Sequence, residues 1–174
     1  MMMTALVVID MQEAMFLQSS PPDDGPGVVE RIAGLLARAR ADRVPVYFVQ
    51  HDGGPGDDLE RGTAGWRIHA PLAPRPGEPI IEKRQPSAFH DTDFDARLKR
   101  AGIDRLVICG MQTEFCVDAT TRAAAGLGYE TVLVSDAHTT FDAGTLTAAQ
   151  IRAEHNRTLG EGFARCVPAA EVAF

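Results

Sequence analysis

Cysteine is scarce in this sequence, and its scarcity excludes two kinds of site. Only three cysteines occur among 174 residues, namely Cys109, Cys116 and Cys166. An odd number cannot form a complete disulfide framework, and no pair has the close spacing of a C-x-x-C zinc or redox motif. The set is typical of a reducing compartment, and we expect at most one of the three thiols to be reactive.

Positive charge and long apolar runs are also lacking. The net charge of −7 repels phosphate backbones, so we expect no nucleic-acid partner. No apolar run approaches the roughly 20 residues that a membrane span needs. The first run, 5–9, is not preceded by the basic region of a signal peptide. We therefore expect a cytoplasmic protein that does not enter a membrane and whose ligand is a small molecule.

The chain alternates short β-branched runs with longer amphipathic stretches, which is typical of βα units around a parallel sheet. The predicted strands are 5–9, 44–49, 80–81, 105–109, 131–134 and 163–167, and the predicted helices are 28–41, 93–101, 113–126 and 143–159. The length suits a single domain over residues 1–174. The predicted fold is α/β with three layers, α/β/α, around a six-stranded parallel sheet. The Gly- and Pro-rich stretch 51–79 is predicted to cover the ligand site.

Three chemically useful side chains lie at the same predicted edge of the sheet, where ligands of parallel sheets bind. Asp10, Lys83 and Cys116 each follow a predicted strand. Thr113 is a candidate N-cap, which places Cys116 in the first helical turn, where the helix dipole favours a thiolate and free N–H groups favour an oxyanion. Asp10 accepts the thiol proton in this interpretation, and the Lys83 ammonium holds the thiolate.

Each of these residues alone has an ordinary explanation, and the prediction rests on the set. A cysteine is most often a buried, inert thiol, and an aspartate after a strand often caps a turn or helix. A lysine after a short strand is usually a solvated surface group. Cys109 and Cys166 lie within apolar runs and are expected to be structural.

Four segments together resemble the isochorismatase-like cysteine hydrolase superfamily. They read VVIDMQEAMF, EKRQPSAF, ICGMQTEFCVDATTRAA and VSDAHTT, and the resemblance extends from about Leu6 to Leu159. It implies a doubly wound sheet of six parallel strands and a homodimer or homotetramer. It also implies an Asp-Lys-Cys catalytic triad, which falls on Asp10, Lys83 and Cys116.

The resemblance implies finer features of the site as well. A cis peptide bond is implied between Met111 and Gln112. The backbone N–H groups of Gln112 and Cys116 are implied to form the oxyanion hole. Phe16 and Trp66 are the aromatic residues that the resemblance assigns to the substrate pocket.

The predicted function is hydrolysis of a small amide or related C–N compound through a covalent acyl-enzyme, without a cofactor. Isochorismatase-type vinyl ether hydrolysis and nicotinamidase activity are the alternatives, and a binding or assembly protein without turnover is the alternative from another class. Nicotinamidases bind a metal through an Asp-x-His pair and further histidines after the second strand. Only His51 and His69 remain in that stretch, so we predict no metal site. The sequence assigns no role to His155.

Overall fold

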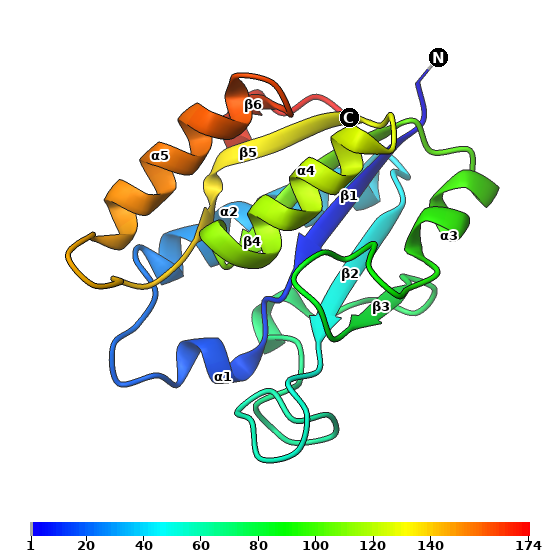
Figure 1. Cartoon of the computed structure of the whole chain (residues 1–174). Helices are drawn as coiled ribbons and strands as arrows, with labels where there is room; N and C mark the ends of the chain where they lie inside the picture. The colour runs from blue at the N-terminus through cyan, green and yellow to red at the C-terminus, as the bar shows by residue number, and fades with distance from the viewer. Residues whose placement is uncertain (1) are drawn as a thin grey trace.

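The structure is a computed structural model that describes residues 2–174. At its centre lies a six-stranded sheet with the order β3-β2-β1-β4-β5-β6, in which every neighbouring pair is parallel (Figure 1). The strands are β1 (Thr4–Ile9), β2 (Val46–His51), β3 (Ile80–Lys83), β4 (Arg105–Met111), β5 (Glu130–Thr139) and β6 (Arg165–Val167). The order reverses between β1 and β4, and sheets of this kind bind ligands outside the carboxyl ends of the strands at that point.

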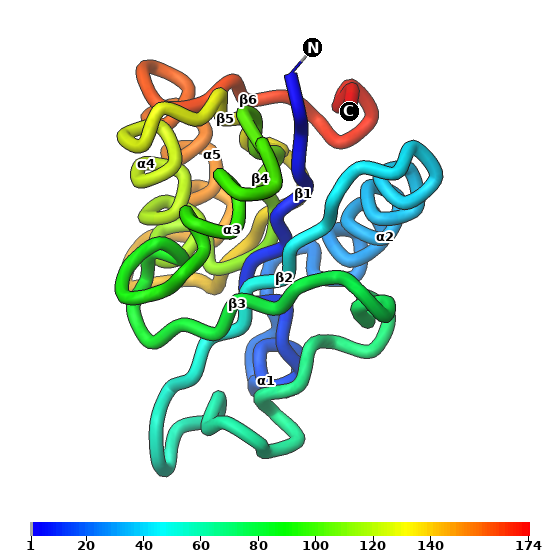
Figure 2. Tube along the Cα trace, turned by 90° about the vertical axis from the view of Figure 1, so that its right-hand side faces the viewer, coloured from blue at the N-terminus to red at the C-terminus, as the bar shows by residue number. Residues whose placement is uncertain are grey.

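Helices cover both faces of the sheet. They are α1 (Glu13–Phe16), α2 (Gly25–Ala41), α3 (Phe94–Arg100), α4 (Asp118–Gly126) and α5 (Ala148–Gly160), with short turns at η1 (Ala70–Leu72), η2 (Thr113–Val117) and η3 (Ala169–Glu171). Figure 2 shows α2 on one side of the sheet and α3, α4 and α5 on the other. The predicted three-layer fold is confirmed. Within residues 2–174, no helix has the length and apolar character required to cross a bilayer.

Two hydrophobic clusters, one on each face, explain the continuous apolar run of β1. Leu6 and Val8 pack in the cluster that includes the inner face of α2, and Val7 and Ile9 pack in the cluster that includes α3, α4 and α5. Successive side chains of a strand point to opposite faces, so a strand covered on both sides must be apolar at every position. Besides Gly25, α2 buries the five apolar residues that predicted it, namely Val28, Ile32, Leu35, Leu36 and Ala39.

Several element boundaries differ from the prediction. The short helix α1 was not predicted, and α2 begins at Gly25 rather than at residue 28. The helix α5 begins at Ala148 rather than at residue 143, because Thr147 caps it in a reciprocal arrangement with the side chain of Gln150. β5 extends to Thr139, beyond its predicted end, because it pairs with β4 again after a shift in register.

Candidate active site

Asp10, Lys83 and Cys116 come from three different elements and meet at the carboxyl edge of the sheet. Asp10 directly follows β1, Lys83 is the last residue of β3, and Cys116 lies in η2 after β4. Nζ of Lys83 lies 2.9 Å from Oδ2 of Asp10, and these two side chains are 0% and 1% exposed, respectively. The same Nζ donates a hydrogen bond to Sγ of Cys116 at 3.1 Å. The structure therefore brings together the three residues that the sequence singled out.

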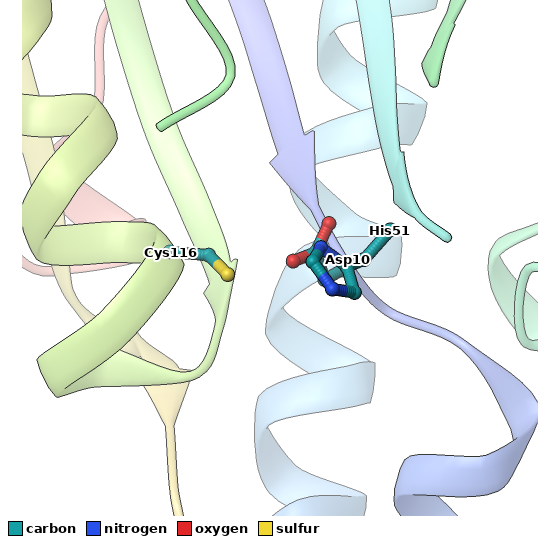
Figure 3. Close-up of side chains that lie close together, drawn as sticks. All are labelled: Asp10, His51 and Cys116. Carbon is teal, nitrogen blue, oxygen red and sulfur yellow. The ribbon is translucent and has the colours of Figure 1, made fainter. Parts of the chain in front are cut away.

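His51, the last residue of β2, belongs to the same group. Nζ of Lys83 lies 3.0 Å from Nδ1 of His51 and donates to the carbonyl oxygen of Gln85 at 3.0 Å. Figure 3 shows the ring of His51 beside Asp10, with the side chain of Cys116 directed toward them from the neighbouring helical turn. Sequence reasoning considered His51 only as a metal ligand. The signal that could have placed it here is its position at a strand end, on the same edge as the other three residues.

The spacing of these donor atoms raises the question of a metal ion. Asp10, His51 and Cys116 each offer one atom, and the three atoms lie within 4.8 Å of one another. Nζ of Lys83 contacts all three residues, so an ammonium group already neutralises this donor set. A divalent ion would have to displace Lys83 from its partners, and the residues present do not fit a resident metal. His69 takes no part, because its Nδ1 pairs with Glu13 at 3.0 Å.

Unusual backbone geometry places Asp10 and the turn that follows β4. Asp10 has φ of 48°, in the left-handed region that aspartate tolerates better than most residues. Gly110 has φ of 124°, and a Cβ atom at this position would lie 2.1 Å from the carbonyl oxygen of Ile9. Only glycine permits β4 to approach β1 this closely at the level of the site. The peptide bond between Met111 and Gln112 is cis.

The turn that carries Cys116 is a single π-helical turn. Gln112 occupies the cap position without a side-chain cap, and its carbonyl oxygen accepts the N–H of Val117 at 3.1 Å. The prediction that Thr113 caps this helix is wrong. Its hydroxyl group is instead bonded to Nδ1 of the buried residue His138 at 2.8 Å.

His138 connects the nucleophile turn to α5. Its Nε2 lies 2.8 Å from Oδ1 of Asn156, whose side-chain amide donates to the carbonyl oxygen of Ser135 at 2.9 Å. Because Oδ1 can only accept, Nε2 carries the proton and Nδ1 is free to accept from Thr113. Burial lowers the pKa of His138 to about 4, so the ring is neutral at pH 7. This chain of bonds fixes the start of the turn against the sheet.

A cavity of about 610 Å³ opens over these residues. Its lining includes Asp10, His51, Gln112 and Cys116, the apolar side chains Met15, Phe115 and Phe141, and the carboxylates Asp57 and Asp58. Asp10 is paired with Lys83, so Asp57 and Asp58 are the carboxylates in this lining that have no cation beside them within residues 2–174. The cavity is of the size that accommodates a small organic ligand.

Residues 4–160 match the model of the isochorismatase domain. The chain belongs to the isochorismatase family. The family resemblance predicted from the four sequence segments is thereby confirmed.

Relatives of known name are similar over most of this chain. A streptothricin hydrolase of Streptomyces noursei is 41% identical over 138 residues, which are 79% of this chain and 50% of that protein. The ureidoacrylate amidohydrolase RutB of Methylorubrum extorquens is 30% identical over 171 residues, covering 77% of this chain and 68% of that protein. The chain thus spans about half the length of the streptothricin hydrolases that it matches.

Solved structures of the family superpose closely. The structure of an isochorismatase from Pseudomonas putida KT2440 has a TM-score of 0.93 at 30% identity and covers 98% of this chain and 90% of that one. A cysteine hydrolase from Pseudomonas syringae pv. phaseolicola 1448A has a TM-score of 0.90 at 27% identity, over 97% of this chain and 90% of that one.

Phe16 and Trp66, the two aromatic residues predicted to line the substrate pocket, do not line the cavity over Cys116. Phe16 stacks on His69, with ring centroids 4.1 Å apart, in a separate hollow. The carbonyl oxygen of Trp66 accepts hydrogen bonds from the side chains of Gln12 and Gln50, both at 2.8 Å, and its backbone thereby ties the long loop to the sheet.

The electrostatics of Cys116 also differ from the expected ones. Burial raises the pKa of its thiol to about 12; the negative charge of Asp10 adds to this effect and the positive charge of Lys83 opposes it. The expectation that the helical position favours a resting thiolate is therefore wrong, and the resting group is a thiol. Oδ1 of Asp10 is buried and has no hydrogen-bond partner within residues 2–174. A protonated sulfur thus lies near the carboxylate of Asp10, one oxygen of which is within 4.8 Å of Sγ.

Proposed function

We propose that this chain is a cysteine hydrolase that cleaves a small amide or related C–N compound through a covalent acyl-enzyme. The observation that carries the proposal is the contact of one ammonium group, Nζ of Lys83, with both Asp10 at 2.9 Å and Cys116 at 3.1 Å in the lining of a ligand-sized cavity. Two relatives, a streptothricin hydrolase and a ureidoacrylate amidohydrolase, support hydrolysis and, in the second case, an amide substrate.

The first half of the reaction forms the acyl-enzyme. Asp10 accepts the thiol proton as Sγ of Cys116 attacks the carbonyl carbon, and the electron pair of the carbonyl bond moves onto oxygen. The backbone N–H groups of Gln112 and Cys116 stabilise this oxyanion. When the tetrahedral intermediate collapses, the C–N bond breaks and the nitrogen takes the proton from Asp10. An amine or ammonia leaves, and the acyl group remains on sulfur.

The second half regenerates the thiol. Asp10 accepts a proton from a water molecule as that water attacks the thioester, and collapse of the second intermediate breaks the C–S bond. The sulfur recovers the proton and the acid product departs. The ammonium group of Lys83, which contacts both Asp10 and the sulfur, stabilises negative charge on either of them as the proton moves.

An ammonia-release screen of small amides and carbamoyl compounds tests this proposal. The wild-type chain is expected to hydrolyse at least one class of compound, and Cys116→Ala is expected to hydrolyse none. Cys166→Ala is the matched control, because it removes another free, partly buried thiol that does not line the cavity. Isochorismate and nicotinamide are assayed in parallel. Vinyl ether cleavage without any amide hydrolysis, or full activity of Cys116→Ala, would contradict the proposal.

A further inference from the structure

We propose, building on the amide hydrolysis proposed above, that His51 contacts the substrate and donates a hydrogen bond from Nε2–H to the leaving-group side of the bound amide. His51 is not a member of the Asp-Lys-Cys set, and the mechanism above does not use it.

The contact with Lys83 fixes the tautomer of His51. The three hydrogens of the Lys83 ammonium are shared among four neighbours, which are Oδ2 of Asp10, Sγ of Cys116, the carbonyl oxygen of Gln85 and Nδ1 of His51. An ammonium group can only donate, so Nδ1 of His51, at 3.0 Å from Nζ, faces it as an acceptor. The single ring proton of the neutral imidazole is then on Nε2. A doubly protonated ring would turn an N–H toward the ammonium of Lys83. Burial, and next the charge of Lys83, lower the pKa of His51 in agreement with a neutral ring.

The protein holds His51 in place but leaves its Nε2–H unused. The backbone N–H of His51 donates to Oε1 of Gln12 at 2.9 Å, and its carbonyl oxygen accepts from Nε2 of the same side chain at 3.0 Å. Within residues 2–174, the hydrogen bonds of His51 involve only these backbone groups and Nδ1. Because the residue also lines the cavity, a fixed donor is available to a ligand there.

The strand order indicates which part of the substrate this donor reaches. Cys116 follows β4, Asp10 follows β1 and His51 ends β2, and these strands are consecutive neighbours in the sheet. The carbonyl carbon must lie at the sulfur, and the leaving nitrogen must lie where Asp10 can protonate it. A substrate that extends from Cys116 across Asp10 therefore presents its leaving group to His51. The ring of His51 lies beside Asp10 in this direction (Figure 3).

Two substitutions separate this role from a purely structural one. In His51→Asn the side-chain oxygen reaches about as far as Nδ1 and still accepts from Lys83, but the donor at Nε2 is lost. In His51→Gln the side-chain amide reaches about as far as Nε2 and keeps a donor there. The two variants therefore retain different halves of the imidazole.

Each variant is assayed with the amide identified in the ammonia-release screen and with 4-nitrophenyl acetate, whose 4-nitrophenolate leaves without needing a proton. We expect His51→Asn to lower kcat/KM for the amide roughly tenfold, the size of one lost hydrogen bond, and to change ester hydrolysis by less than about twofold. His51→Gln should keep most of the amide activity. Equal losses for ester and amide, or higher amide activity in His51→Asn than in His51→Gln, would mean that His51 acts only through Lys83.

A second measurement needs no substrate. Two-bond ¹H–¹⁵N NMR spectra of the five histidines, with His51 assigned through His51→Gln, report the ring tautomer at neutral pH. We expect the neutral Nε2–H form, with no stoichiometric change on addition of Zn²⁺. An Nδ1–H tautomer or stoichiometric Zn²⁺ binding at His51 would overturn the inference. A wild-type chain that hydrolyses no amide overturns the proposed function and this inference together, whereas an active wild type with an equally active His51→Asn overturns the inference alone.

Discussion

The ionisation of Cys116 should respond in opposite directions to the loss of its two charged neighbours. Asp10 raises the pKa of the thiol and Lys83 lowers it, on top of the larger effect of burial, and the resulting pKa is about 12. Asp10→Asn keeps the size of the side chain and removes the negative charge. Lys83→Met keeps much of the length and removes the positive charge. The first change should lower the pKa of Cys116, and the second should raise it.

The magnitude follows from the geometry. A carboxylate oxygen of Asp10 and Sγ of Cys116 lie within 4.8 Å. Two unit charges at that separation interact by about 3.5 kcal/mol at an effective dielectric constant near 20, or roughly 2.5 pKa units. At pH 9, Asp10→Asn should therefore contain on the order of a hundredfold more thiolate. The lower basicity of that thiolate offsets about tenfold of this gain, which leaves a net acceleration of alkylation of about tenfold.

The assay is iodoacetamide labelling at pH 9, followed by mass spectrometry of the peptide that contains Cys116. Cys166 in the same sample is the internal control, because it lies outside this charge cluster and should label equally in all variants. Turnover of Asp10→Asn should nevertheless fall by about 10²- to 10⁴-fold, because the proton acceptor is gone. Slower labelling in Asp10→Asn, or unchanged labelling in Lys83→Met, would refute the electrostatic account of the site.

Three further outcomes are expected from the structure. Because burial lowers the pKa of His138 from 6.5 to about 4, the unfolded chain binds a proton that the folded chain excludes, and stability should fall by about 3 kcal/mol as the pH drops across this interval. Thermal melting of His138→Gln should show a correspondingly shallower pH dependence, and an unchanged slope would contradict the assignment. Gly110→Ala should cost about 3 kcal/mol or more in denaturant unfolding, since its Cβ would meet backbone of β1, and wild-type stability would show that the close approach is not needed. Asp57 and Asp58 line the cavity and form no ion pair within residues 2–174. Changing both residues to Asn should therefore lower kcat/KM by up to about fivefold for amides that bear an ammonium group, but not for neutral amides. An equal effect on charged and neutral amides would show that these carboxylates do not select the substrate.

The fold could be predicted because its signals are local and repeated. β1 is apolar at every position from Ala5 to Ile9, and α2 repeats its buried side chains with helical spacing, so each pattern shows which faces of the element are covered. The element boundaries were harder, because they depend on single contacts. The cap formed by Thr147 and Gln150 shortens α5, and the four residues of α1 are too few to show a periodic pattern.

The candidate site could be predicted only in part, for a related reason. Asp10, Lys83 and Cys116 could be predicted to lie together, because each follows a predicted strand and the carboxyl ends of parallel strands lie at one edge of the sheet. The contact between Lys83 and His51 joins residues 32 positions apart, and that between Thr113 and His138 joins residues 25 apart, and no sequence spacing specifies either.

The surroundings of single side chains could not be predicted from the sequence pattern. Phe16 and Trp66 were assigned to the pocket, but the lining comes instead from Met15, Phe115 and Phe141. His155 had no predicted role, and the structure places its Nδ1 3.0 Å from Asp118 on α4.

The central claim is that Cys116 carries the acyl group, and trapping that intermediate tests it most directly. The chain is mixed with 4-nitrophenyl acetate or with an amide identified in the ammonia-release screen, quenched in acid within the first turnover, and analysed by intact-mass and peptide mass spectrometry. The account predicts one added acyl group, located on Cys116 and absent from Cys116→Ala. An acyl group on Cys109 or Cys166, or undiminished amide hydrolysis by Cys116→Ala, would contradict it.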